Sequence, residues 1–436
     1  MRVHISLLKR VIFALIPSAL LLVAATVAVR GLEATRAIDT TRADDRAKYP
    51  PVDLLSRKSS LSGPVWVVNR SGSINESRVP VEKRAGDWRV LVVGESFAKG
   101  SPWADYYEKL GQGHGGIPDW IAAETAMRCP SVNVQMINAG SGAASSGVVL
   151  GIARELMVTS PDLMIVMCGN NEGFVDRTRL GDALQEWALY RALKKGILPE
   201  PTRSHRPYFT PQDDDTQKIR DHYERNIRDM VATAREAGVT PVLATLPINV
   251  KYPREGTIRP EDSAWPEDDA AIVEGQRRQY QDGDCPGAIE AYLRSPNEAW
   301  AARYIGECLE RMNRTDDARE MLRVYVENMP QNRIRPSMND FVRRLARDEN
   351  LVLVDLERHA DDLSPTGITS PDLFVDFCHM TWRGYYLMAR EILRVLWERE
   401  LVPHAAGEPR PNPSIEEIID ANGWQRLREV GDRRGG

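Results

Sequence analysis

Short apolar runs alternate with longer amphipathic stretches through the central part of the chain. The first run, 89–93, is rich in β-branched residues and stops at Gly94, and similar apolar runs recur at 132–137, 162–167, 239–245 and 351–355. Runs of this length and composition predict strands that are buried on both faces of a sheet. Stretches with helical patterning accompany them at 117–126, 148–158, 213–237, 338–349 and 382–397. Strands that alternate with helices predict an α/β fold, a parallel sheet covered on both faces.

The region between the fourth and fifth predicted strands departs from this alternation and is mostly helical in pattern. Six of its residues fall near the offsets of the tetratricopeptide helix–turn–helix repeat: Ile305, Gly306, Leu309, Ala318, Leu322 and Pro330. A second, degenerate copy precedes it, with Ala288 standing 30 residues before Ala318, whereas a regular repeat has a period of about 34 residues. We interpret the region as a tetratricopeptide-like insertion in the sheet domain. A plain helical hairpin is the alternative.

The N-terminal region holds one long uncharged apolar run, from Val11 to Val29. A run of about 20 apolar residues can span a bilayer as a helix. Lys9 and Arg10 precede it, and positive residues favour the cytoplasmic side, so we expect the rest of the chain to work outside the cytoplasm. A cleaved signal peptide is the alternative, because Thr26 and Ala28 are small residues in suitable positions. The length of the run favours an uncleaved transmembrane anchor.

These patterns divide the chain into six parts. We expect a cytoplasmic stub and transmembrane anchor at 1–30, a polar stalk and entry segment at 31–87, and a C-terminal tail at 401–436. The α/β domain comprises 88–250 and 333–400, and the helical insertion at 251–332 interrupts it. Within the tail, an amphipathic stretch at 415–430 predicts a docked helix.

Composition and charge narrow the function classes. Lys and Arg number 57 against 62 Asp and Glu, a formal charge of −5, so the chain lacks the basic excess that would hold a phosphate backbone. We therefore expect no nucleic-acid partner. The five cysteines are widely spaced and form no C-x-x-C motif, which indicates neither a zinc site nor a disulfide scaffold. We expect buried free thiols, with a Cys285–Cys308 disulfide as the alternative.

Candidate chemistry gathers after the predicted strands, because open parallel sheets bind ligands at the carboxyl ends of their strands. Ser96 follows the first strand in the segment Gly94-Glu95-Ser96, on a tight turn that suits a nucleophile. The second strand is followed by a loop of small residues, 138–147, whose backbone N–H groups can approach an anion. The third is followed by Asn170 and Asn171, whose amides can donate to a developing oxyanion. Each segment by itself is also compatible with an ordinary turn.

The fourth element of chemistry is the segment Asp376-Phe377-Cys378-His379, just before the last predicted helix of the sheet domain. Among the seven histidines, His379 is the one that has an Asp three residues before it. That spacing lets the carboxylate bind one imidazole nitrogen while the other faces a pocket as a general base. An isolated Asp-x-x-His is more often a surface pair, so the prediction depends on all four segments together.

Taken together, the four segments resemble the blocks of the SGNH hydrolases, also called GDSL-type esterases. Gly94-Glu95-Ser96 is similar to the first block, with Glu in place of Asp, and Gly169-Asn170-Asn171-Glu172 is similar to the third block. Asp376 and His379 match the last block. Counting from Asn138, the backbone donor of the second block falls on Ala143, with Gly142 beside it. The resemblance covers about residues 88–399, with interruptions, and implies a flavodoxin-like parallel sheet sandwiched by helices.

The resemblance implies a serine esterase that needs neither a metal nor an organic cofactor. Ser96 would be the nucleophile, His379 the base and Asp376 its partner, with the oxyanion held by the backbone of Ser96 and Ala143 and by the Asn171 side chain. Two alternatives remain. The same serine could transfer an acyl group to a cell-envelope glycan, or the chain could be a non-catalytic binding protein that uses its repeats.

The third block with Glu172 and the helical insertion resemble a membrane-anchored subgroup of this family. The resemblance to this subgroup implies the type of reaction and names no particular substrate. The location outside the cytoplasm and the habit of the family favour an acylated small molecule or polysaccharide, with an O-acetyl ester as one candidate. The resemblance also implies a membrane-bound protein whose catalytic domain lies in the periplasm or outside the cell, and a protein partner at the tetratricopeptide-like insertion.

Overall fold

The computed structural model describes residues 21–32, 54–68, 74–105, 113–172, 189–190, 192–193, 213–252, 269–329 and 333–432. The chain forms two compact units, of which the larger comprises residues 49–174 and 206–436. In the other unit, residues 21–32 are helical. Across the described ranges, no helix has the length and hydropathy of a membrane span. Residues 11–20 of the predicted anchor lie outside those ranges.

A five-stranded parallel sheet is the centre of the larger unit. Its strands are β4 (Asp87–Gly94), β5 (Asn133–Gly140), β6 (Leu163–Met167), β7 (Thr240–Ala244) and β8 (Val352–Val354), in the order β5-β4-β6-β7-β8. This is the flavodoxin-like order, in which the connections reverse direction beside the first strand and leave a crevice at the carboxyl ends. All five residues of β6 are buried, because helices cover both faces of the sheet. The predicted parallel α/β fold is confirmed.

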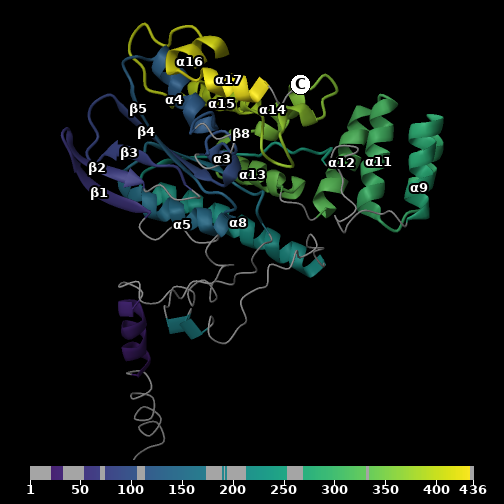
Figure 1. Ribbon diagram of the computed structural model, residues 1–436, viewed down its shortest axis with the longest axis horizontal. Coiled ribbons are helices and arrows are strands. Elements are labelled where there is room, and N and C mark those ends of the chain that lie inside the picture. The colour runs from purple at the N-terminus through teal and green to yellow at the C-terminus, as the bar shows by residue number, and fades with distance from the viewer. Residues whose placement is uncertain are drawn as a thin grey trace, which may run out of the picture. The chain divides into compact units, whose positions relative to one another are not determined.

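Helices pack on both faces of this sheet (Figure 1). On one face, α4 (Ile117–Arg128) contacts α15 (Trp382–Glu398). On the other, α5 (Ser146–Leu156) contacts α8 (Asp213–Glu236), and α13 (Pro336–Asp348) contacts α8 and β7. The bounds of these helices and of the five strands lie close to those predicted from periodicity, because each apolar stripe faces the sheet. Shorter elements complete the domain: α3 (Ser96–Lys99), η1 (Met157–Thr159), α14 (Leu356–Asp362) and η3 (Pro371–Leu373).

The predicted insertion contains helices that pack on one another in sequence. They are α9 (Ala270–Gln276), which continues into η2 (Arg277–Asp282), then α10 (Cys285–Tyr292), α11 (Glu298–Arg311) and α12 (Thr315–Asn328). Figure 1 shows α11 and α12 side by side. A Cβ on Gly306 would lie 2.8 Å from Leu322 Cγ, so glycine permits the close approach of these two helices. The helix–turn–helix is as predicted. Its membership of the tetratricopeptide class stays a prediction, and Pro330 lies outside the described residues.

Part of the segment interpreted as a stalk is folded. Residues 55–80 form a three-stranded antiparallel sheet of β1 (Leu55–Ser60), β2 (Gly63–Val68) and β3 (Ser77–Pro80). Leu54, Ile74 and Val79 are buried in the same core cluster as β4, and β3 contacts β5. The stalk interpretation is therefore wrong for this part. Polar residues on the exposed strand faces hid the alternation of buried positions.

The C-terminal tail docks on the sheet domain as two helices, where the sequence predicted one. They are α16 (Ile415–Asn422) and α17 (Gln425–Asp432), and Gly423 separates them with a φ of 69°. Trp424 packs edge-on against Trp120 of α4, with 5.0 Å between ring centroids. All five cysteines are buried free thiols, as expected.

Candidate active site

Close backbone packing places Ser96 at the carboxyl end of the sheet. β4 ends at Gly94, and Ser96 is the first residue of α3. A Cβ on Gly94 would lie 1.9 Å from the carbonyl oxygen of Met167, and one on Gly140 would lie 2.3 Å from the Lys99 nitrogen. Glycine at both positions lets α3 start within two residues of the strand and pack directly on β5. Ser96 therefore stands on the sharp strand-to-helix turn that its sequence predicted.

The structure brings Ser96, His379 and Asp376 into one chain of hydrogen bonds. His379 Nε2 lies 2.8 Å from Ser96 Oγ, and His379 Nδ1 lies 2.7 Å from Asp376 Oδ2. With the Nδ1 proton donated to the carboxylate, Nε2 is left to accept the proton of the serine hydroxyl. The arrangement can therefore withdraw a proton from Ser96.

The backbone around the Asp–His segment keeps both side chains in place. Asp376 Oδ1 accepts hydrogen bonds from the N–H of Cys378 at 2.9 Å and of His379 at 2.7 Å. Val375 N donates to the His379 carbonyl at 2.9 Å, which closes the turn. Burial alone would raise the pKa of Asp376, but its contacts with His379 and these backbone donors outweigh burial and lower it. The carboxylate therefore stays charged and can stabilise a protonated imidazole.

Asp376, Cys378 and His379 could also be considered as metal ligands, because their ligand atoms lie within 4.8 Å of one another. Both imidazole nitrogens are, however, already engaged with Asp376 and Ser96. Burial raises the pKa of the Cys378 thiol well above its usual value, whereas metals bind the thiolate. The geometry favours proton transfer between side chains over metal ligation.

The predicted oxyanion donors flank the Glu95–Ser96 turn. Ser141 N donates to the Gly94 carbonyl at 3.0 Å, which holds the loop with Gly142 and Ala143 against the end of β4. Ala143 is exposed and has a left-handed backbone with a φ of 57°. Asn171 is buried, and its Nδ2 donates to Glu95 Oε2 and to the Ala144 carbonyl, both at 3.3 Å. Asn171 would thus have to exchange one of these long bonds to reach an oxyanion.

Two carboxyl groups near Asn171, the buried Glu95 and the half-buried Glu172, had no function assigned to them from the sequence. Glu95 accepts hydrogen bonds from Asn170 N at 3.0 Å, and Glu172 accepts from Ser146 N at 2.6 Å and Ser146 Oγ at 2.9 Å. Burial, together with the charge of Glu172, raises the pKa of Glu95 to about 8. Burial raises the pKa of Glu172 to about 7. The only signal in the sequence was that Glu occupies both positions where the family blocks have Asp.

These raised pKa values predict that the protein loses stability as the pH rises from about 5 to 8. Over this range the folded state keeps protons that the unfolded state has released, so the free energy of unfolding falls by up to about 1.4 kcal/mol per pH unit for each protonated group. Glu95→Gln should remove the contribution of Glu95 to the pH dependence. The free energy of unfolding should then fall less steeply with pH, by up to about 1.4 kcal/mol per pH unit. Urea unfolding of both proteins at pH 5, 6, 7 and 8 measures it. If the free energy of unfolding changes equally with pH in both proteins, the raised pKa assigned to Glu95 is wrong. Glu172 and Asp119 should leave some pH dependence in both proteins.

Comparison with known proteins finds solved structures that are only weakly similar to this chain. No family model matches the chain. No curated protein matches it. Among solved structures, a GDSL-like lipase from Bacteroides thetaiotaomicron aligns over 71% of this chain and 88% of its own, with 13% identity and a TM-score of 0.33. The acetylxylan esterase Axe2 from Geobacillus stearothermophilus aligns over 72% and 94%, with 14% identity and a TM-score of 0.34. Similarity at this level does not establish a function for this chain.

Proposed function

We propose that this chain is a serine esterase of SGNH type that hydrolyses acyl esters. The observation that supports the proposal best is the hydrogen-bonded chain from Ser96 through His379 to Asp376. Ser96 lies at the end of β4, whereas Asp376 and His379 lie in the loop before α15, at least 280 positions later in the sequence. A structural role for such a half-buried Asp–His pair would not require that its free nitrogen point at a serine on the crevice side of the sheet.

In the proposed reaction, Ser96 Oγ attacks the ester carbonyl while His379 Nε2 takes the hydroxyl proton. Asp376 holds the proton on Nδ1 and stabilises the imidazolium that forms. The protonated His379 then gives its proton to the departing alcohol, and the C–O bond of the ester breaks to leave an acyl group on Ser96. A water molecule, deprotonated by His379 in the same way, releases the acid and restores the serine.

The negative oxygen of the tetrahedral intermediate needs donors that are already oriented. We assign the backbone N–H groups of Ser96 and Ala143 and the Nδ2 of Asn171 to this task. The left-handed conformation of Ala143 and the contact of its loop with β4 support the second donor. For Asn171, the length of its two contacts supports an exchange in favour of the oxyanion, because a charged acceptor forms a stronger hydrogen bond than a neutral one.

The finer parts of the proposal concern place and substrate. The uncharged run at 11–29 supports an anchor with the catalytic unit outside the cytoplasm, and in that location an O-acetyl ester of a polysaccharide is a suitable substrate. The helical hairpin at α11 and α12 supports a docking role for a protein partner.

Covalent labelling tests the proposal directly. A fluorophosphonate probe should label the folded full-length chain on Ser96, which peptide mass spectrometry would locate, and p-nitrophenyl acetate should be hydrolysed by the same preparation. Heat-unfolded protein is the control and should not react. A folded chain that is neither labelled nor able to hydrolyse the ester would refute the esterase, and labelling at another serine would refute the assigned nucleophile.

A further inference from the structure

Arg333 is a buried cation, and two of its guanidinium nitrogens lack hydrogen-bond partners among the described residues. It lies just before α13 and is only 4% exposed. Its Nη1 donates to the backbone carbonyl of Asn249. Its Nε and Nη2 are buried and have no hydrogen-bond partner among the described residues. Buried arginines are normally paired, since an unpaired buried charge is costly.

The two unsatisfied nitrogens have a specific geometry. In a guanidinium group, the N–H of Nε and one N–H of Nη2 are parallel and point the same way. This fork matches two oxygens of a carboxylate or a phosphate, which it binds through paired hydrogen bonds. The third nitrogen, Nη1, is held by Asn249, so the fork is fixed in orientation.

A second cation, Arg303, lies close to Arg333. The Arg333 and Arg303 guanidinium carbons lie 5.1 and 5.5 Å from the centroid of the same ring, that of Tyr325. Burial lowers the pKa of Arg333, as does the charge of Arg303, and these effects outweigh the opposing contribution of the Tyr325 hydroxyl. Glu307 binds Arg303 at 3.2 Å and Tyr280 at 2.7 Å, so it is already engaged. An anionic group brought in by a ligand would balance the second cation.

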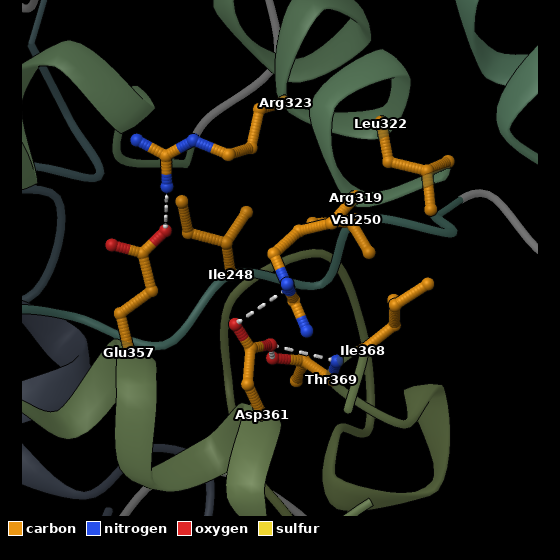
Figure 2. Close-up of a pocket in the computed structure, with 9 residues that line it drawn as sticks. All are labelled: Ile248, Val250, Arg319, Leu322, Arg323, Glu357, Asp361, Ile368 and Thr369. Carbon is orange, nitrogen blue, oxygen red and sulfur yellow. Dashed lines mark hydrogen bonds and ion pairs between the residues drawn. The ribbon is translucent and has the colours of Figure 1, made fainter. Parts of the chain in front are cut away.

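The arginines of a neighbouring cavity show the usual arrangement. Figure 2 shows this cavity, which Ile248 and Val250 line on either side of Asn249 in the sequence. There, Arg323 pairs with Glu357 at 2.7 Å, and Arg319 donates to the Gly367 carbonyl and lies 3.9 Å from Asp361. Both of these arginines have a carboxylate within 4 Å. Arg333 therefore differs from Arg319 and Arg323, because no carboxylate of the described residues forms an ion pair with it.

Arg333 is also connected to both sides of the candidate active site. Asn249, which receives its Nη1 hydrogen bond, donates through Nδ2 to the Asp376 carbonyl at 2.8 Å. The next residue, Ile334, donates its N–H to Asn170 Oδ1 at 2.8 Å, and Asn170 precedes Asn171. Arg333 is thus linked to the Asp376 turn through hydrogen bonds of Asn249. It is linked to the Asn170–Asn171 turn through its chain neighbour Ile334.

We propose that Arg333 determines substrate specificity by binding a carboxylate or phosphate group of a substrate whose ester lies at Ser96. This inference rests on the proposed esterase and adds the chemical class of its substrate, an anionic ester. It predicts that an acetylated uronic acid is preferred over the corresponding neutral sugar.

Binding without turnover provides the first test. Calorimetric titration of Ser96→Ala with glucuronate, glucose and inorganic phosphate should give a dissociation constant for an anion about 10- to 100-fold lower than for glucose, the effect of hydrogen bonds to a charged group. Adding Arg333→Met should abolish this difference between the dissociation constants. Adding Arg333→Lys, which keeps the charge but loses the paired N–H groups, should retain only part of it. Adding Arg319→Met, the matched control, should leave it unchanged. Preference for glucuronate would identify a carboxylate, and preference for phosphate a phosphate.

Kinetics provides the second test. The ratio of kcat/KM for acetylated glucuronate to that for acetylated glucose should be about 10 or more in the wild type and close to 1 in Arg333→Met. If neither anion binds, or if Arg333→Met and Arg333→Lys bind it like the parent, the inference is wrong. If an anion binds through Arg333 while the wild type hydrolyses no ester, the inference about the anion site holds and the esterase fails.

Discussion

Replacement of Ser96 by alanine is expected to lower kcat for p-nitrophenyl acetate by about 10⁵- to 10⁶-fold, the loss typical of removing the nucleophile from a serine triad. His379 Nε2 lies 2.8 Å from Ser96 Oγ, so alanine removes both the attacking atom and the proton that His379 accepts. The KM should change little, because no other contact of the site depends on this hydroxyl. Steady-state kinetics with purified full-length protein measures the loss.

Ser145 offers a matched control for this substitution. It lies in the neighbouring loop at the start of α5 and makes no side-chain cap there. Ser145→Ala should therefore retain activity within about two-fold, as is usual for a substitution that breaks no contact. If Ser96→Ala keeps more than a tenth of the wild-type kcat, Ser96 is not the nucleophile.

Replacement of Asp376 by asparagine is expected to lower kcat by about 10⁴-fold with little change in KM. The structure gives the reason. Oδ1 of Asp376 accepts the N–H groups of Cys378 and His379, so an asparagine would put its oxygen there and turn its NH₂ group toward His379 Nδ1. That amide donates to Nδ1, which moves the imidazole proton to Nε2. Nε2 can then no longer accept the proton of Ser96.

The change of tautomer can be separated from a loss of folding. Nδ1-bound and Nε2-bound protons of imidazole have distinct nitrogen chemical shifts, so ¹⁵N NMR of histidine-labelled protein should show the switch in Asp376→Asn. The unfolding midpoint should stay near that of the wild type, because the two backbone hydrogen bonds to the asparagine oxygen persist. An unchanged tautomer with full activity would argue against the role of Asp376 as the orienting residue.

Local pattern was sufficient to predict the sheet domain. The runs 89–93 and 162–167 are apolar without alternation because β4 and β6 are covered on both faces. Burial on both faces can therefore be recognised from the amino-acid composition of the run. The helices followed from their apolar stripes for the same reason. Residues 55–80 were misread as a stalk, because strands with one exposed face carry many polar residues, and their pairing is between segments rather than within one.

The sequence by itself determined which residues follow the strands, which identified Ser96 and Asn171 as candidates. The Asp-x-x-His spacing identified Asp376 and His379. Only the tertiary structure decided how they meet: the distances that link His379 to Ser96 and Asp376, and the two contacts that occupy the Asn171 amide. The same holds for the raised pKa of Glu95 and for the unsatisfied fork of Arg333. Strand and helix patterns depend on neighbours along the chain, which a sequence displays. Burial of a charge and the supply of its partners depend on residues far apart in sequence, and folding alone brings those together.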